Sequence, residues 1–227
     1  MDDILSFVLE PVAYLICAAF ILLHSIRIRQ LKYFILIAYY FMATLLIARA
    51  NLFREVNNIE IYNVLNLITF VFLGAYYFLT IITAWRRKVI LAMAVGGGLY
   101  YAGTKILVSD SILLFDSTGQ VLLSIAMLTM VSFFLQQLWI NVNEEPLSMN
   151  FDFWFSSAQL TYHVASFLIF LTYRYLTKKV IDGNYLYEDR KLLTELWAVH
   201  NVILFLSSSI IAVSTLWIRY RSKSASS

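Results

Sequence analysis

Seven long apolar stretches, separated by short polar segments, divide the chain. They cover residues 8–26, 32–49, 61–85, 88–108, 119–141, 151–176 and 192–218. Each is close to the roughly 20 apolar residues that a helix needs to cross the hydrocarbon core of a bilayer. The pattern predicts an all-α fold, a polytopic membrane helix bundle of seven transmembrane helices that forms a single integral-membrane domain over residues 1–227. The short connections predict that helices adjacent in sequence lie antiparallel.

The composition supports this prediction. Hydrophobic residues make up 61% of the chain and charged residues 14%, whereas soluble domains average about 25% charged residues. An ordinary water-soluble domain is therefore excluded. The single cysteine, Cys17, lies inside an apolar stretch, so the fold cannot depend on an intramolecular disulfide.

The positions of lysine and arginine predict the orientation. Before the fourth stretch, six basic residues fall on one side of the membrane and two on the other. The six are Arg27, Arg29, Lys32, Arg86, Arg87 and Lys88, and the two are Arg49 and Arg54. Because cytoplasmic loops carry the excess of basic residues, the N-terminus is expected outside and the C-terminus in the cytoplasm. The basic segment 174–191 argues in the opposite direction.

Several polar side chains fall in the outer half of the predicted spans. Ionisable residues are rare there and face the bundle interior, which makes each a candidate for a functional site. An outward-opening cavity that binds a small polar ligand is one interpretation. Interfacial charges that pair with each other, and asparagines that join helices by hydrogen bonds, are the alternative. The candidates are Glu10, Arg49, Asn63, Asn66, Lys105, Glu195, His200 and Asn201.

Tyr162 and His163 lie near the middle of the sixth stretch. His163 and His200 could ligate a metal or haem from facing helices, but no histidine recurs at helical spacing, so no metal and no cofactor is expected. A histidine with satisfied hydrogen bonds in the core is the simpler interpretation. Residues Ser207–Ser209 lack a nucleophile motif and are expected to bond to backbone carbonyls or to bridge helices. No enzymatic activity is expected.

The fourth stretch contains the segment GGGLYYAG. Gly96 and Gly103 are seven residues apart and therefore share a helix face. Small residues allow helices to approach closely in lipid, so a tight helix crossing is expected on this face, with a gate or hinge as the alternative.

Two segments carry a resemblance to a known family. The first has a proline, a Phe-Trp pair and a tyrosine about two turns later, and the second has an aromatic residue before a polar pair. These residues are Pro146, Phe153, Trp154 and Tyr162, followed by Trp197, His200 and Asn201. The chain resembles uncharacterised seven-helix inner-membrane proteins of Bacteroidetes-type bacteria, which are often encoded beside sensor histidine kinases. The resemblance implies a multi-pass protein of the bacterial inner membrane with a signalling role, and it supplies no catalytic residues.

The resulting hypothesis is a sensory module in the lipid bilayer. An outside ligand or a membrane state would shift the sixth and seventh helices, and a cytoplasmic signalling protein such as a histidine kinase would receive the change. A small transporter or channel subunit, with a path lined by Lys105, Glu195, His163 and His200, is the alternative. A structural subunit of a larger membrane complex is a third possibility. The short basic segments flank spans, so they fit anionic lipid and predict no nucleic-acid partner. The oligomeric state stays open.

Overall fold

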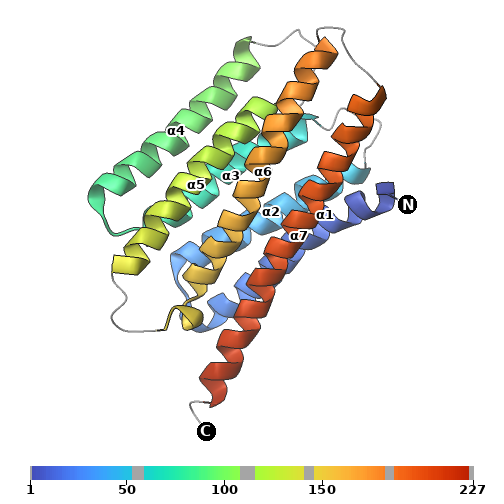
Figure 1. Ribbon diagram of the computed structural model, residues 1–227. Helices are drawn as coiled ribbons and strands as arrows, with labels where there is room; N and C mark the ends of the chain where they lie inside the picture. Colours follow the sequence, from blue (N-terminus) through green and yellow to red (C-terminus); the bar gives the residue numbers. More distant parts are fainter. Residues whose placement is uncertain (1, 53–58, 108–115, 141–145, 182–186, 225–227) are drawn as a thin grey trace.

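The computed structural model describes residues 2–52, 59–107, 116–140, 146–181 and 187–224. Seven α-helices and one short 3₁₀-helix make up these residues, and no strand occurs among them (Figure 1). The helices are α1 (Asp2–Ile28), α2 (Leu31–Leu52), α3 (Ile59–Thr80), α4 (Ala84–Leu107), α5 (Ser117–Ile140), α6 (Phe151–Ile181) and α7 (Tyr187–Ser224), with η1 (Leu147–Met149) before α6. The all-helical prediction is confirmed for the described residues.

The boundary between α3 and α4 differs from the sequence prediction, which continued the third span to residue 85. α3 ends at Thr80 and α4 begins at Ala84. Gln137 on α5 satisfies the backbone at this turn: its Oε1 accepts from the Ile82 N–H at 2.7 Å, and its Nε2 donates to the Thr80 carbonyl at 3.3 Å. A side chain from a distant helix thus allows the chain to turn inside an apolar run.

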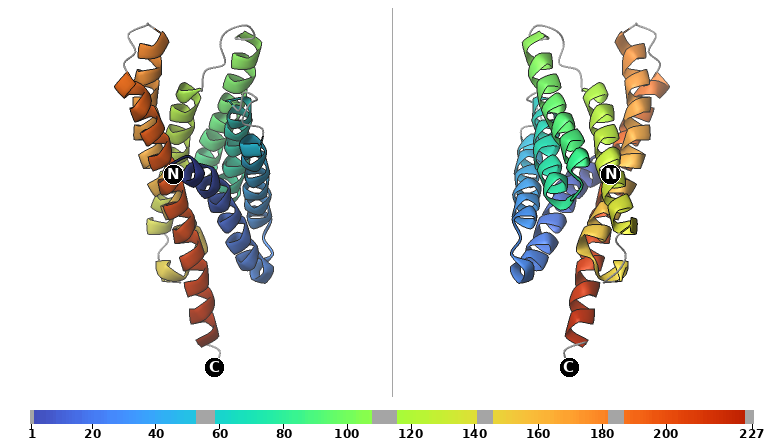
Figure 2. Two further views of the ribbon diagram at one scale, coloured as in Figure 1. Left: turned by 90° about the vertical axis from the view of Figure 1, so that its right-hand side faces the viewer. Right: turned by 90° about the vertical axis from the view of Figure 1, so that its left-hand side faces the viewer.

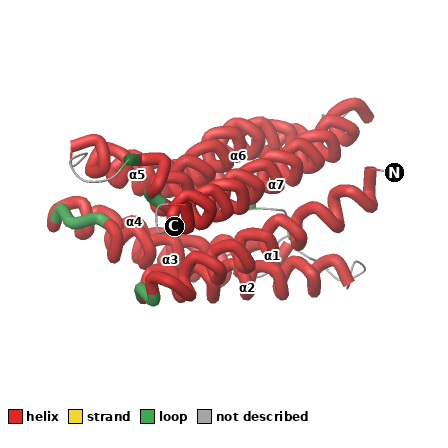
Figure 3. Tube along the Cα trace, turned by 90° about the horizontal axis from the view of Figure 1, so that it is seen from below, coloured by secondary structure: helices red, strands yellow, loops and turns green. Residues whose placement is uncertain are grey.

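Six helices form a closed ring through their contacts (Figure 3). α1 packs against α2 and α7, α2 against α3, α3 against α5, α5 against α6, and α6 against α7. α4 packs against α3 and α5 at the edge of this arrangement. The views in Figure 2 show two layers, with α1 to α4 in one and α5 to α7 in the other. The first and last helices of the chain are therefore neighbours.

A different glycine from the expected pair allows the α3–α4 crossing. A Cβ added to Gly97 would lie 2.7 Å from Cδ1 of Phe70 on α3, closer than real contacts allow. Nothing lies within 4 Å of such an atom at Gly96 or Gly103 among the described residues. The expectation of a tight crossing on the Gly96–Gly103 face is wrong, because that face is turned away from α3.

Five of the helices are long and apolar enough to cross a membrane: they are α1, α2, α3, α5 and α7, each over most of its length. Large apolar side chains are exposed along these helices, including Phe41, Val71 and Leu206. Exposed apolar surface of this kind matches hydrocarbon as its solvent, so the fold is that of a membrane protein. The described residues form seven α-helices. That all seven cross the membrane stays a prediction.

The last helix extends beyond the others. α7 has 38 residues, a length of about 57 Å at 1.5 Å per residue. The hydrocarbon core is about 30 Å thick. The C-terminal turns of α7 lie beyond the ends of all the other helices in Figure 1. This part carries Arg219, Arg221 and Lys223.

Candidate functional site

Polar and aromatic side chains lie among the aliphatic ones in the interior of the ring. Near the end at which α1 begins, Glu10 is buried and its Oε2 accepts a hydrogen bond of 3.0 Å from the hydroxyl of Tyr62 on α3. The ring of Trp197 on α7 packs edge-on against Tyr62, with the centroids 5.2 Å apart. α1, α3 and α7 thus meet around one carboxyl group.

Histidine 200 joins α7 to α6 at the same level. Its Nε2 lies 3.2 Å from the hydroxyl of Tyr162, and its Nδ1 lies 3.5 Å from Oγ of Ser166. Phe170 and Trp197 pack against its ring at centroid distances of 4.9 and 5.5 Å. A buried imidazole held by two hydroxyls is a satisfied core histidine, as one of the sequence interpretations expected.

Two small cavities lie along this interior. The first is beside Glu10, and its wall is given by Glu10, Tyr14, Tyr39, Tyr62, Leu65, Asn66, Thr69, Gln120, Leu123, Tyr162, His163, Phe170, Trp197 and His200. The second lies deeper and is lined by Tyr14, Cys17, Tyr39, Tyr40, Gln159, Tyr162, His163, Leu204, Ser207, Ser208 and Ile211. Each has about 20 Å³ of free space, enough for about one water molecule.

Four side chains form the wall between the two cavities, because Tyr14, Tyr39, Tyr162 and His163 line both. Tyr39 and Thr69 share a hydrogen bond of 3.1 Å on the side of Glu10. On the deeper side, Gln159 donates to the hydroxyl of Tyr40 at 2.7 Å. The polar interior is therefore continuous across the level of His163.

The structure gathers five of the predicted site residues around these cavities. They are Glu10, Asn66, Tyr162, His163 and His200. Arg49 lies on the surface and lines neither cavity, and Glu195 is exposed and pairs with Lys191 one turn earlier on α7, at 3.8 Å. A shared depth along the helices did not bring these two charges into the interior, because their helix faces point outward.

The remaining candidates are placed differently. Asn63 is half-buried and Asn201 is fully buried, and neither lines either of these two cavities. Asn66 accepts a hydrogen bond from Gln120, so it joins α3 to α5 as interhelical hydrogen bonding predicts. The side chain of Lys105 lies outside the described residues. Ser208 and Ser209 donate to the carbonyls four residues earlier, at 2.9 Å each.

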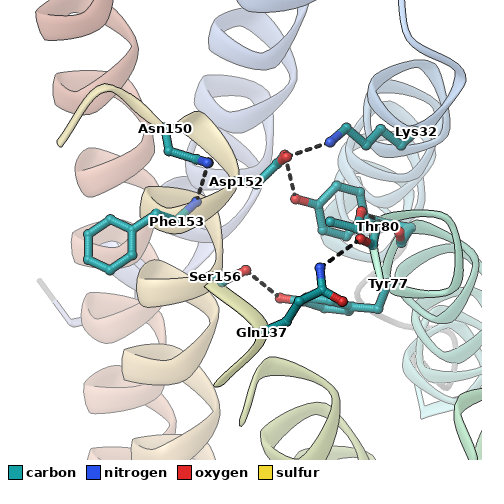
Figure 4. Close-up of polar contacts among 9 residues, drawn as sticks. Lys32, Tyr77, Thr80, Gln137, Asn150, Asp152, Phe153 and Ser156 are labelled. Atoms are coloured by element: carbon teal, nitrogen blue, oxygen red, sulfur yellow. Dashed lines mark hydrogen bonds and ion pairs between the residues drawn. The ribbon is translucent and has the colours of Figure 1, made fainter. Parts of the chain in front are cut away.

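A second polar cluster, which the sequence analysis did not identify, lies near the opposite end of the ring. Lys32 at the start of α2 forms an ion pair with Asp152 at the start of α6, and both are largely buried (Figure 4). The hydroxyl of Tyr76 donates to the same carboxylate at 2.8 Å, and that of Tyr77 donates to Ser156 at 3.3 Å. One sequence signal could have revealed this cluster: Asp152 is an acidic residue in the first turn of a predicted span. A carboxylate buried there needs a cation nearby.

Comparisons with known proteins found no relative of this chain. No protein-family model, no curated protein and no solved structure matches it. The resemblance to seven-helix inner-membrane proteins therefore stays a prediction, and the candidate site stands on its geometry alone.

Proposed function

We propose that the protein is a membrane-embedded signalling module with seven transmembrane helices. In this proposal the N-terminus lies outside the cytoplasmic membrane of a bacterium and the C-terminus lies inside. A change in the interior around His163 and His200 moves α7, and a cytoplasmic partner such as a histidine kinase responds to the projecting end of that helix.

A single observation carries the proposal: one part of α7 lines the interior of the bundle, and the C-terminal part of the same helix is basic and projects beyond the other helices. Trp197 and His200 line the cavity beside Glu10. The same continuous helix ends at Ser224 and carries Arg221 and Lys223 in its last turn. A helix transmits displacement along its axis, so a change at His200 reaches the projecting end without a further hinge.

The contacts between α6 and α7 provide an element that can change. His200 is held to α6 by the hydroxyls of Tyr162 and Ser166. Near the other end, Nη1 of Arg27 on α1 donates to Oγ of Ser222 on α7 at 2.6 Å. A ligand that binds more tightly to one arrangement of the His200 contacts than to another shifts α7 between its two positions. Only such a difference in affinity between two states changes their populations.

The test is capture of a partner by the projecting end. The protein is purified in mild detergent from its native membranes, and bound proteins are identified by mass spectrometry. We expect a stoichiometric histidine kinase with the unchanged chain and its loss from the Arg221→Ser, Lys223→Ser double variant. The control is Arg174→Ser, which removes an exposed charge at the other end of the bundle. Absence of a kinase from the unchanged protein, or equal capture by the double variant, would contradict the proposal.

The orientation is tested separately. A cysteine placed at Lys223 in a Cys17→Ser background is expected to react with a membrane-impermeant maleimide only after the cells are opened. Labelling in intact cells would reverse the proposed orientation and remove the projecting end from the cytoplasm.

A transport function is the second candidate, and the extent of the polar interior favours it. Polar side chains reach from Glu10 at one end of the ring to Asp152 near the other. A transporter or channel subunit would conduct a small solute or ion along this line. Flux through liposomes that contain the purified protein, absent from protein-free liposomes, would favour this candidate over signalling.

A further inference from the structure

Among the buried carboxylates of the described residues, Glu10 differs from the others in having no ion pair. Asp152 is paired with Lys32, and Asp189 lies 3.4 Å from Nζ of Lys179. Glu10 is 3% exposed, and the structure gives it one hydrogen bond, from the neutral hydroxyl of Tyr62, and no ion pair within the described part of the chain. A buried charge without a counter-charge is costly, so this carboxyl group is neutralised either by a proton or by a bound cation.

The cavity beside Glu10 has the chemistry of a cation site. Besides the carboxylate, its wall carries the hydroxyls of four tyrosines and one threonine and the amides of Asn66 and Gln120. Oxygen atoms of this kind are the ligands that hard cations prefer. The rings of Tyr62 and Trp197 also line this cavity, and the face of an aromatic ring attracts cations.

His163 adds an independent indication of an occupant. It is 2% exposed, it lines both cavities, and neither of its ring nitrogens has a hydrogen-bond partner within the described part of the chain. A neutral imidazole has one acceptor nitrogen and one N–H donor, and buried groups of this kind are normally satisfied. A small polar species in the adjoining space would satisfy a nitrogen that no group among the described residues reaches.

Charge and size restrict the occupant. A single carboxylate balances one positive charge, and a divalent ion would leave a net charge buried in the bundle. The free space is about 20 Å³, which accepts a particle of about the size of water. Larger organic amines do not fit this space.

We infer that the cavity between Glu10 and His163 binds a monovalent cation of about the size of a water molecule, either ammonium or an alkali-metal ion. The carboxylate of Glu10 supplies the charge, and the oxygens of α2, α3 and α5 complete the shell. Ammonium in addition donates a hydrogen bond to the imidazole of His163. This inference deepens the proposed function, because it names the species to which the signalling module responds.

The experiment measures thermal unfolding of the purified protein in detergent at one pH. Chloride salts of sodium, potassium and ammonium are compared with N-methylglucamine chloride at equal ionic strength. We expect at least one of the three cations to raise the melting temperature by about 5 °C near saturation. The Glu10→Gln variant is expected to lose this difference, and Glu195→Gln, which removes an exposed carboxylate, is expected to retain it.

Trp197 provides a second measurement if Glu10→Gln does not fold. Addition of the cation is expected to change tryptophan fluorescence saturably in the unchanged protein and in Trp217→Phe, but not in Trp197→Phe. Equal melting temperatures in all four chlorides, or a cation effect that persists in Glu10→Gln, would overturn the inference and leave a proton as the neutralising species. The melting and fluorescence measurements do not depend on a bound kinase, so failure here is distinguishable from failure of partner capture.

Discussion

The hydroxyl of Tyr76 on α3 donates a hydrogen bond of 2.8 Å to the carboxylate of Asp152 on α6, which also pairs with Lys32 on α2. Three helices that are not all neighbours in the ring are thereby joined through its interior. Removal of only one partner of such a buried ion pair is costly, because the remaining charge stays buried without a counter-charge.

The first prediction concerns this pair. Lys32→Met and Asp152→Asn are each expected to lower the free energy of unfolding by about 3 kcal/mol. The double variant is expected to lose clearly less than the sum of the two, because it leaves no uncompensated charge. Denaturation in detergent measures the cycle, with the exposed Lys88→Met as the control. Additive losses would show that the two charges do not interact.

The second prediction concerns the link between α6 and α7. Tyr162→Phe removes the hydroxyl that lies 3.2 Å from His200 and is expected to cost about 1 kcal/mol of stability. Under the proposed function it also alters signalling while the protein remains in the membrane. Tyr220→Phe removes an exposed hydroxyl on the projecting end and is the matched control. Equal effects of the two changes on stability would contradict a role for this hydrogen bond.

The third prediction separates two adjacent glycines. Gly97→Ala places a methyl group against the ring of Phe70 and is expected to destabilise the protein by about 1–3 kcal/mol. Gly96→Ala meets nothing within 4 Å and is expected to be neutral or stabilising by up to about 1 kcal/mol, because alanine favours the helix. Thermal unfolding of the two variants in the same detergent tests the order, and the reverse order would contradict the α3–α4 packing.

The fourth prediction concerns the turn between α1 and α2. Arg29 has a φ of 45°, a left-handed conformation that side chains with a Cβ adopt at a cost. Arg29→Gly is expected to raise stability by about 1 kcal/mol, since glycine is the usual residue at such a helix end. Arg29→Ala removes the same charge and retains the strain, so it is expected to give no such gain. A gain of equal size from alanine would assign the effect to the charge.

The helices were predictable because each buries or exposes a long apolar run. The α3–α4 boundary was not, because residues 78–84 contain no proline, glycine or charge and the turn depends on Gln137 from α5. Part of the candidate site followed from depth alone: Glu10, Asn66 and His200, three of the eight outer candidates, line one cavity. Depth does not specify the direction of a side chain, so Arg49 and Glu195 were placed inside although both are exposed.

Two of the three tyrosines that line both cavities, Tyr14 and Tyr39, were missed for a related reason. Tyr14 and Tyr39 lie in apolar stretches and read as ordinary membrane aromatics. Their roles depend on which helices face each other across the ring, and a single sequence contains no record of those pairs. The Lys32–Asp152 pair spans 120 positions in the chain, so local spacing could not reveal it.

The contact between α1 and α7 has a consequence for biogenesis. Among the described helices, α1 is synthesised before the others and packs in the folded bundle against α7, which is synthesised after them, and α3 must meet α5 after α4 has been released between them. Co-translational insertion therefore yields an open arc of helices. In this arc the polar groups of α1, including Glu10, stay exposed until α7 packs against α1. Closure of this ring therefore follows the synthesis of α7, and a chain truncated before α7 would present that polar interior to the lipid or to a membrane protease.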